Sequence, residues 1–186
     1  MPEYSVPKRL VPEIPFPSYS YVPGEAPHPT RDRDGHSYEE EAEDITLVPA
    51  PDPENWQKSK LYLYGIDLFN YGYYWETHEA WEDLWHALGR TGTTANFLKG
   101  IIHLAAAGIK AKQGQTGSMQ KHARRAAGLL NEIRLKRPKE QPFYMGLDLN
   151  ELVEWSEGVA ENSAAAIKET PTTVDGGVFC FLLEPE

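Results

Sequence analysis

The chain has 186 residues, of which 40% are hydrophobic, and its formal net charge is −10. This length allows one domain of ordinary size with appendages, and the apolar content is sufficient for a packed core. No apolar run reaches the roughly 18 residues of a membrane span, and the N-terminus lacks the apolar stretch of a signal peptide. The single cysteine, Cys180, excludes an internal disulfide framework and favours a reducing, cytoplasmic location.

Charge divides the chain into three parts. The balance is −8 over residues 1–55, +5 over residues 56–136 and −7 over residues 137–186. We therefore expect the acidic flanks to lie against the basic centre, with the acidic run at 39–44 solvated or facing basic residues. Nucleic acid is not an expected partner at this overall charge, because phosphate binding relies on accumulated Lys and Arg. A basic cluster near 110–125 leaves open a salt-sensitive accessory role on nucleic acid.

Residues 1–55 form a segment distinct from the rest of the chain. Eleven of the fifteen prolines fall here, too many for a helix or a central strand. The segment is expected to be extended, and its aromatic residues, including Phe16, Tyr19 and Tyr21, are apolar enough to dock on a neighbouring surface. We expect it to wrap the core. The predicted organisation is thus a Pro-rich acidic segment at 1–55, a helical domain at 56–168 and an extended tail at 169–186.

Helical periodicity begins after Trp56 and continues to about residue 167. Gly72, Gly89 and Gly114 are placed to end successive helices, and Asp148 has the spacing of an N-cap. The third helix is apolar almost all round, as expected of a central helix. Short connections favour antiparallel neighbours, so the fold class is all-α, a compact helical bundle or orthogonal array of about five helices. The first predicted helix carries Leu61, Tyr64, Leu68 and Tyr71 at helical spacing and ends at Gly72, and the others cover about residues 73–88, 94–113, 118–136 and 148–167.

The second predicted helix carries the side chains suited to ligand binding or catalysis. Helical spacing places a histidine and a carboxylate on the same face as four aromatic side chains. These six residues are the predicted ligand pocket: Tyr74, Trp75, His78, Trp81, Glu82 and Trp85. The other acidic residues of the helix, Glu76, Glu79 and Asp83, are expected on a solvated face.

Burial on the aromatic face would oblige Glu82 to have a partner, because an unpaired buried carboxylate costs several kcal/mol. Three solutions remain open. His78 and Glu82 can belong to a closed structural network, to a pocket that binds a small ligand, or to a divalent metal site. For the metal site, His103 or His36 is a candidate third ligand. The spacing excludes a zincin, since Glu82 stands where the second histidine of that motif is required.

The pattern Phe69-Asn-x-Gly-x-Tyr-Trp-Glu-x-His78-Glu-x-Trp-Glu82-x-x-Trp85, with the block Phe97-Leu-x-Gly-Ile-Ile-x-Leu-Ala-Ala-Ala, resembles domain-of-unknown-function family 309 of bacteria and archaea. The resemblance covers roughly residues 60–136. It implies a helical fold and a His-x-x-x-Glu-x-x-Trp/Tyr motif suggested to bind metal. It implies no activity. His103 departs from the Gln or Lys that relatives more often carry there.

Two functions of different classes follow. The first is a helical binding or scaffold domain without catalytic activity, whose site around His78 and Glu82 holds a small molecule. The second is a metal-dependent, hydrolase-like enzyme in which His78 and Glu82 are ligands, supplemented by Glu79 or by a residue of the N-terminal segment. No other catalytic motif is present in the sequence. The partner is a small molecule or a protein, and an exposed aromatic helix also allows a homo-oligomer.

Overall fold

The computed structural model describes residues 7–38, 48–167 and 177–186. Helices dominate this part of the chain, which confirms the all-α fold class with an extended Pro-rich N-terminal segment. The acidic run at 39–44 lies outside the described residues. No described helix combines the length and the apolar character needed to cross a bilayer.

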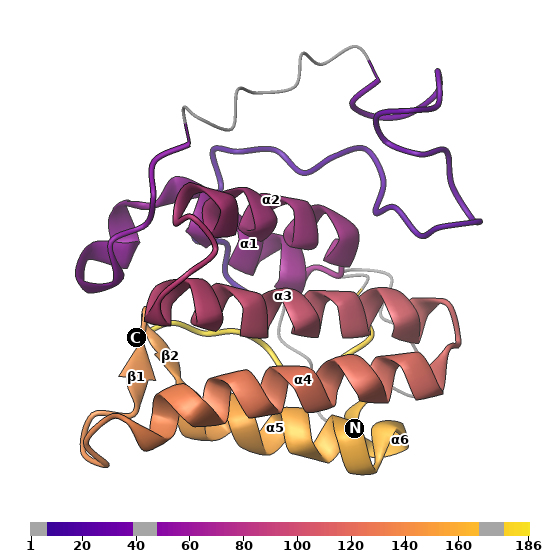
Figure 1. Cartoon of the computed structure of the whole chain (residues 1–186). Coiled ribbons are helices and arrows are strands. Elements are labelled where there is room, and N and C mark those ends of the chain that lie inside the picture. Colours follow the sequence, from indigo (N-terminus) through magenta and orange to yellow (C-terminus); the bar gives the residue numbers. More distant parts are fainter. Residues whose placement is uncertain (1–6, 39–47, 168–176) are drawn as a thin grey trace.

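Five longer helices form the body of the molecule (Figure 1). The central helix α3 packs against α2 on one side and α4 on the other; α1 packs on α2, and α5 packs on α4. The antiparallel hairpin β1–β2 pairs Phe143 with Asp148 and Tyr144 with Leu147. The elements are η2 (Pro53–Lys58), α1 (Lys60–Asn70), α2 (Tyr74–Ala87), α3 (Thr93–Lys112), α4 (Thr116–Leu135), β1 (Phe143–Tyr144), β2 (Leu147–Asp148), α5 (Leu149–Glu161) and α6 (Ser163–Ala166).

The helix ends follow local chemistry. Gly72, Gly89 and Gly114 have φ values of +80°, +67° and +67°, the left-handed conformation that reverses the chain after a helix. The side chain of Asp148 caps α5 by accepting hydrogen bonds from the backbone N–H groups of Asn150 and Glu151. The helix predicted at 148–167 is shorter than expected, because Asn162, at φ −135° and ψ 77°, separates α5 from α6.

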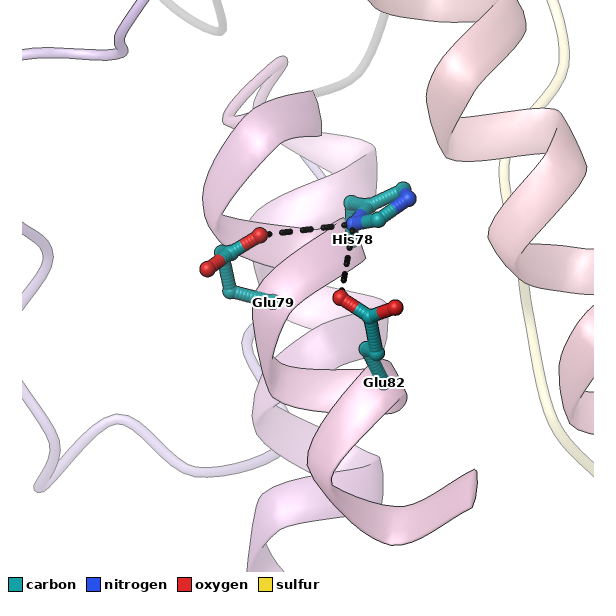
Figure 2. A group of neighbouring side chains, drawn as sticks. All are labelled: His78, Glu79 and Glu82. Atoms are coloured by element: carbon teal, nitrogen blue, oxygen red, sulfur yellow. Dashed lines mark ion pairs between the residues drawn. The ribbon is translucent and has the colours of Figure 1, made fainter. Parts of the chain in front are cut away.

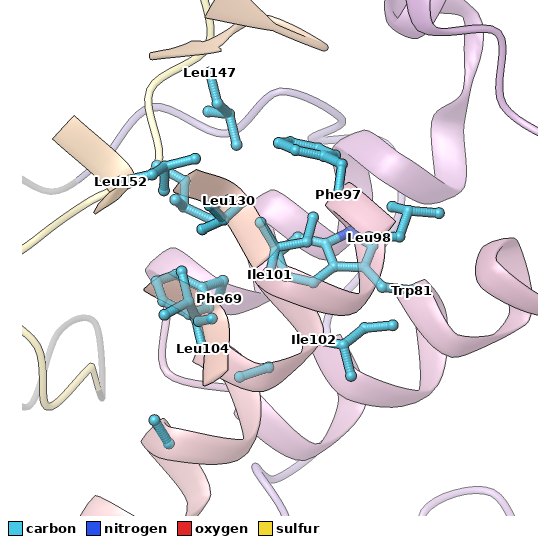
Figure 3. Close-up of a cluster of buried hydrophobic side chains, with 14 of the residues drawn as sticks. Phe69, Trp81, Phe97, Leu98, Ile101, Ile102, Leu104, Leu130, Leu147 and Leu152 are labelled. Carbon is cyan, nitrogen blue, oxygen red and sulfur yellow. The ribbon is translucent and has the colours of Figure 1, made fainter. Parts of the chain in front are cut away.

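The core is built from α1 to α5, with contributions from the β1–β2 hairpin and the C-terminal tail, and Figure 3 shows some of its side chains. Small residues on α3 allow close packing. A Cβ at Gly100 would approach Leu130 of α4 to 2.9 Å, and one at Gly108 would lie 2.4 Å from the Tyr74 ring of α2. Both neighbouring helices therefore pack against α3 at positions where a larger side chain has no room.

The described N-terminal residues lie over α1 and α2 (Figure 1). Asp67 of α1 accepts hydrogen bonds from the backbone N–H groups of Leu10 and Val11, at 2.7 and 3.0 Å. Phe16 stacks on Tyr73, with ring centroids 5.0 Å apart. The C-terminal residues also dock on the last turn of α1, where Asn70 exchanges two hydrogen bonds of 2.8 Å with the backbone of Leu183. The helical body thus holds both flanking segments through buried polar side chains.

Candidate functional site

The helix α2 is positioned by its two ends. Gly72 turns the chain out of α1, and the Thr77 hydroxyl donates a hydrogen bond of 2.9 Å to the Tyr73 carbonyl in the first turn. At the other end, the N–H of Arg90 donates to the Trp85 carbonyl at 3.1 Å, closing the last turn. These contacts define the first and last turns of α2, and the packing of α2 against α1 and α3 decides which of its faces is buried.

One face of α2 is part of the core. Tyr74, Thr77, Trp81 and Leu84 are fully buried. Trp81 stacks on Phe69 and donates from Nε1 to the backbone of α1 at 3.3 Å. Tyr74 is likewise engaged, because its hydroxyl accepts hydrogen bonds from the backbone of the C-terminal tail. Of the six predicted pocket residues, Tyr74 and Trp81 therefore lie in the core.

The remaining predicted residues lie outside the core. Trp75 and Trp85 are half-buried at the two flanks of the helix, and His78 and Glu82 lie on the outer side. A step of one residue turns a helix by about 100°, so His78 and Glu82, which directly follow the buried Thr77 and Trp81, are turned away from the core and partly exposed. The expected burial of Glu82 is wrong for this reason. The structure does not bring all six residues into one pocket.

His78, Glu79 and Glu82 form a cluster on this outer side (Figure 2). Nδ1 of His78 lies 3.4 Å from Oε1 of Glu79 and 3.8 Å from Oε2 of Glu82. The three side chains are 29%, 49% and 39% exposed, and one ligand atom from each lies within 4.8 Å of the others. Water screens these ion pairs, so their contribution to stability is small. The cluster is accessible to a ligand from solution.

His86 was missed in the sequence. Its Nε2 lies 4.0 Å from Oε1 of Glu82, which places Glu82 between histidines one helical turn before it and one turn after it. The sequence spacing could have indicated His86, because positions 78, 82 and 86 lie on one side of a helix. His86 is not part of the three-residue cluster.

The buried carboxylate of α2 is Glu76, not Glu82. Glu76 is 7% exposed, and its Oε1 accepts a hydrogen bond of 2.8 Å from the backbone N–H of Tyr21 and lies 3.2 Å from Nε2 of His36. Burial raises the pKa of Glu76, and the hydrogen bond from Tyr21 opposes this shift. Glu76 was expected on the solvated face. The N-terminal segment covers it, and the spacing within α2 carries no information about that cover.

The candidate third ligands have other partners in the structure. His36 pairs with Glu76, and His103 of α3 pairs with His122 of α4, with the two Nδ1 atoms 3.2 Å apart. Burial lowers the pKa of His103 to about 4, and repulsion between the protonated forms of His103 and His122 adds to this shift. The pKa of His122 is lowered too, by burial and by the nearby charge of Arg125. Both rings are therefore neutral at pH 7, and the hydrogen bond between them needs one ring to donate from Nδ1 and the other to accept there.

The basic cluster near 110–125 is partly engaged in internal contacts. Nζ of Lys112 donates to the Gly72 carbonyl at 2.6 Å and to the Ser20 hydroxyl at 3.1 Å, and burial lowers its pKa. Nζ of Lys110 donates to Gln113 at 2.8 Å. Lys112 thus serves to attach the N-terminal segment to the body of the molecule.

Fold and site together define a helical domain organised around a His-x-x-x-Glu-x-x-Trp helix whose polar residues face outward. Residues 62–121 match the family model described as domain of unknown function (DUF309). This match agrees with the resemblance that the residues between Phe69 and Trp85 indicated, and it extends from α1 into α4. No curated protein matches the chain.

Proposed function

We propose that this protein is a binding domain whose helix α2 holds a divalent metal ion through His78, Glu79 and Glu82. The observation that carries the proposal is the convergence of three ligand atoms within 4.8 Å on an accessible helix face. One imidazole nitrogen and two carboxylate oxygens form a donor set suited to zinc, manganese or iron. The described residues therefore fit a metal ion of this class, and the remaining coordination positions would face solvent.

The core-facing side of α2 supports this assignment. Trp81 and Tyr74 anchor the helix to α1 and to the C-terminal tail, so the three ligand side chains project from a backbone that is fixed on its other side. Ligands on a rigid element hold a metal with less loss of conformational entropy than ligands on a loop. The aromatic residues of the motif thus position the site and leave metal contact to the three polar residues.

The experiment is elemental analysis of untagged protein, followed by calorimetric titration of the chelator-treated chain with zinc, manganese and ferrous iron. We expect one ion per chain for at least one of these metals, and a loss of affinity of tenfold or more in His78→Ala and in Glu82→Gln. Glu157→Gln is the matched control, because Glu157 is exposed on α5 far along the chain from the cluster. Equal affinity in all four proteins would refute the assignment.

A metal-dependent, hydrolase-like enzyme is the second candidate. It is favoured by the exposure of Glu79 and Glu82, which leaves room for water and a substrate beside a bound ion. Hydrolysis of chromogenic ester and phosphoester substrates that requires metal, and that fails in His78→Ala, would select this candidate over a pure binding domain.

For partners and location, we propose a cytoplasmic protein that binds a small ligand or another protein. Nucleic acid is not proposed as a partner, in view of the net charge of −10 and the internal contacts of Lys112. A second copy of the chain is a possible partner of the half-buried aromatic flanks of α2, which light scattering coupled to gel filtration would detect.

A further inference from the structure

A cavity of about 650 Å³ lies between the N-terminal segment and the helices α1 and α2. Its walls include prolines and the rings of Phe16, Tyr64 and Trp75. The volume falls within the usual range for small organic ligands, roughly 300–1,000 Å³, and greatly exceeds what a single metal ion needs.

The charge of the lining has one sign. Three carboxylates line the cavity, those of Glu76, Glu79 and Asp83, whereas no Lys or Arg of the described part of the chain does so. His36 is the other ionisable side chain able to carry a positive charge here, and it is already paired with Glu76. Such a lining repels anions and attracts a cation.

Glu76 adds a second, independent observation. Its side chain is 6% exposed, and although Oε1 has two partners, Oε2 is buried without a hydrogen-bond partner among the described residues. A buried carboxylate that is incompletely paired is unfavourable by several kcal/mol. A positive charge in the adjoining cavity would offset this energy through the low-dielectric wall, even without direct contact with Oε2.

The aromatic walls suit the rest of such a ligand. Trp75 packs edge-on against Tyr21 and His28 of the N-terminal segment, so its ring is fixed in place. The ring of Phe16 already has the guanidinium of Arg9 over its face at 3.9 Å, which shows that this side of the molecule accommodates cations on aromatic rings. Arg9 therefore occupies this face of the Phe16 ring, and Trp75 and Tyr64 provide the aromatic surface for a ligand.

We propose that this cavity binds an organic cation, an ammonium or guanidinium group on an apolar body, with Glu76 and Asp83 supplying the countercharge and Trp75 and Tyr64 the apolar contact. The N-terminal segment then forms one wall of the binding site, and α1 and α2 form the other. The inference goes beyond the metal cluster on α2, with which the cavity shares Glu79.

The test is titration of the full chain, in buffer containing EDTA, with phenethylammonium and with 2-phenylethanol as the neutral probe of equal size. Binding is followed by calorimetry and by Trp fluorescence. We expect saturable binding of the ammonium at least tenfold tighter than that of the alcohol. EDTA removes metal, so this binding is measured independently of the cluster formed by His78, Glu79 and Glu82. A lysine side chain presented as Nα-acetyl-lysine methylamide tests whether a protein partner can supply the cation.

The variants are Glu76→Gln and Asp83→Asn, with Glu157→Gln as the control for loss of one acidic charge elsewhere. Glutamine keeps an acceptor for the N–H of Tyr21, and Asp83→Asn provides a second test should Glu76→Gln release the N-terminal segment. We expect each cavity variant to weaken ammonium binding tenfold or more, and the control to change it less than twofold. The proposal is overturned by equal binding of the two phenethyl probes, by no saturable binding of either cationic probe up to millimolar concentration, or by unchanged affinity in both cavity variants.

Discussion

Replacement of Asp67 by alanine should detach the N-terminal segment from α1. Asp67 is 1% exposed and accepts two backbone hydrogen bonds, from Leu10 and Val11, and a third from Nε of Arg9 at 3.3 Å. Arg9 is itself oriented, because it also donates to the carbonyls of Val11 and Ile14. One carboxylate thus fixes three consecutive residues of the segment.

The size of the effect follows from these contacts. Hydrogen bonds to a charged group contribute about 1.5–3 kcal/mol each, and removal of one partner of a buried pair costs about 3–5 kcal/mol. The Arg9 side chain is 18% exposed and can return to water once the segment lifts away, which limits the loss to the energy of docking. We therefore expect Asp67→Ala to lower the free energy of unfolding by about 3 kcal/mol. Asp67→Asn should cost slightly less, because one amide oxygen still accepts.

The assay is urea denaturation followed by Trp fluorescence, together with limited trypsin digestion at Lys8 and Arg9. Asp67→Ala should unfold at lower urea and be cleaved faster at these two sites. Glu13→Gln is the matched control, because its ion pair with Lys60 also joins the N-terminal segment to α1 but is exposed. It should leave the midpoint unchanged. A loss below about 1 kcal/mol in Asp67→Ala, with unaltered cleavage, would refute the view that this carboxylate holds the segment.

Three further predictions concern the helical body. Gly65→Ala should lower the free energy of unfolding by about 2–3 kcal/mol in urea titrations, because the added Cβ would lie 2.1 Å from Nε1 of the buried Trp81. Gly128→Ala is the control: an added Cβ there meets open space, so this variant should raise the free energy of unfolding by about 0.5–1 kcal/mol. Asn70→Ala should accelerate hydrogen exchange at Leu183 by tenfold or more, and unchanged exchange there would contradict the proposed anchor. His103 binds its proton only near pH 4 in the folded chain but near pH 6.5 when unfolded, so stability should fall as pH drops between these values. Denaturation curves at pH 7 and pH 4.5 give the loss of unfolding free energy on acidification. This loss should be about 1 kcal/mol smaller in His103→Gln than in the wild type, allowing for solvent screening.

The sequence by itself determined the helices and their order. Glycine tolerates positive φ, so Gly72, Gly89 and Gly114 marked three helix ends, and the acidic N-cap Asp148 marked a start. Helical spacing also placed His78 and Glu82 on one side of α2, and in the structure Nδ1 of His78 lies 3.8 Å from Oε2 of Glu82. These features depend on residues a few positions apart, whose interactions are the same in any tertiary context.

Only the tertiary structure decided which side of α2 is buried. The aromatic residues Trp75, Trp81 and Trp85 occupy a broad arc of the helix, and their spacing alone does not say which of them enters the core. Contacts with distant parts of the chain determine which side chains are buried: Trp81 packs against α1, and the N-terminal segment covers Glu76. Burial is a property of what lies opposite a side chain, so the exposed cluster at His78 and the acidic cavity beside Glu76 could be located only once the chain was folded.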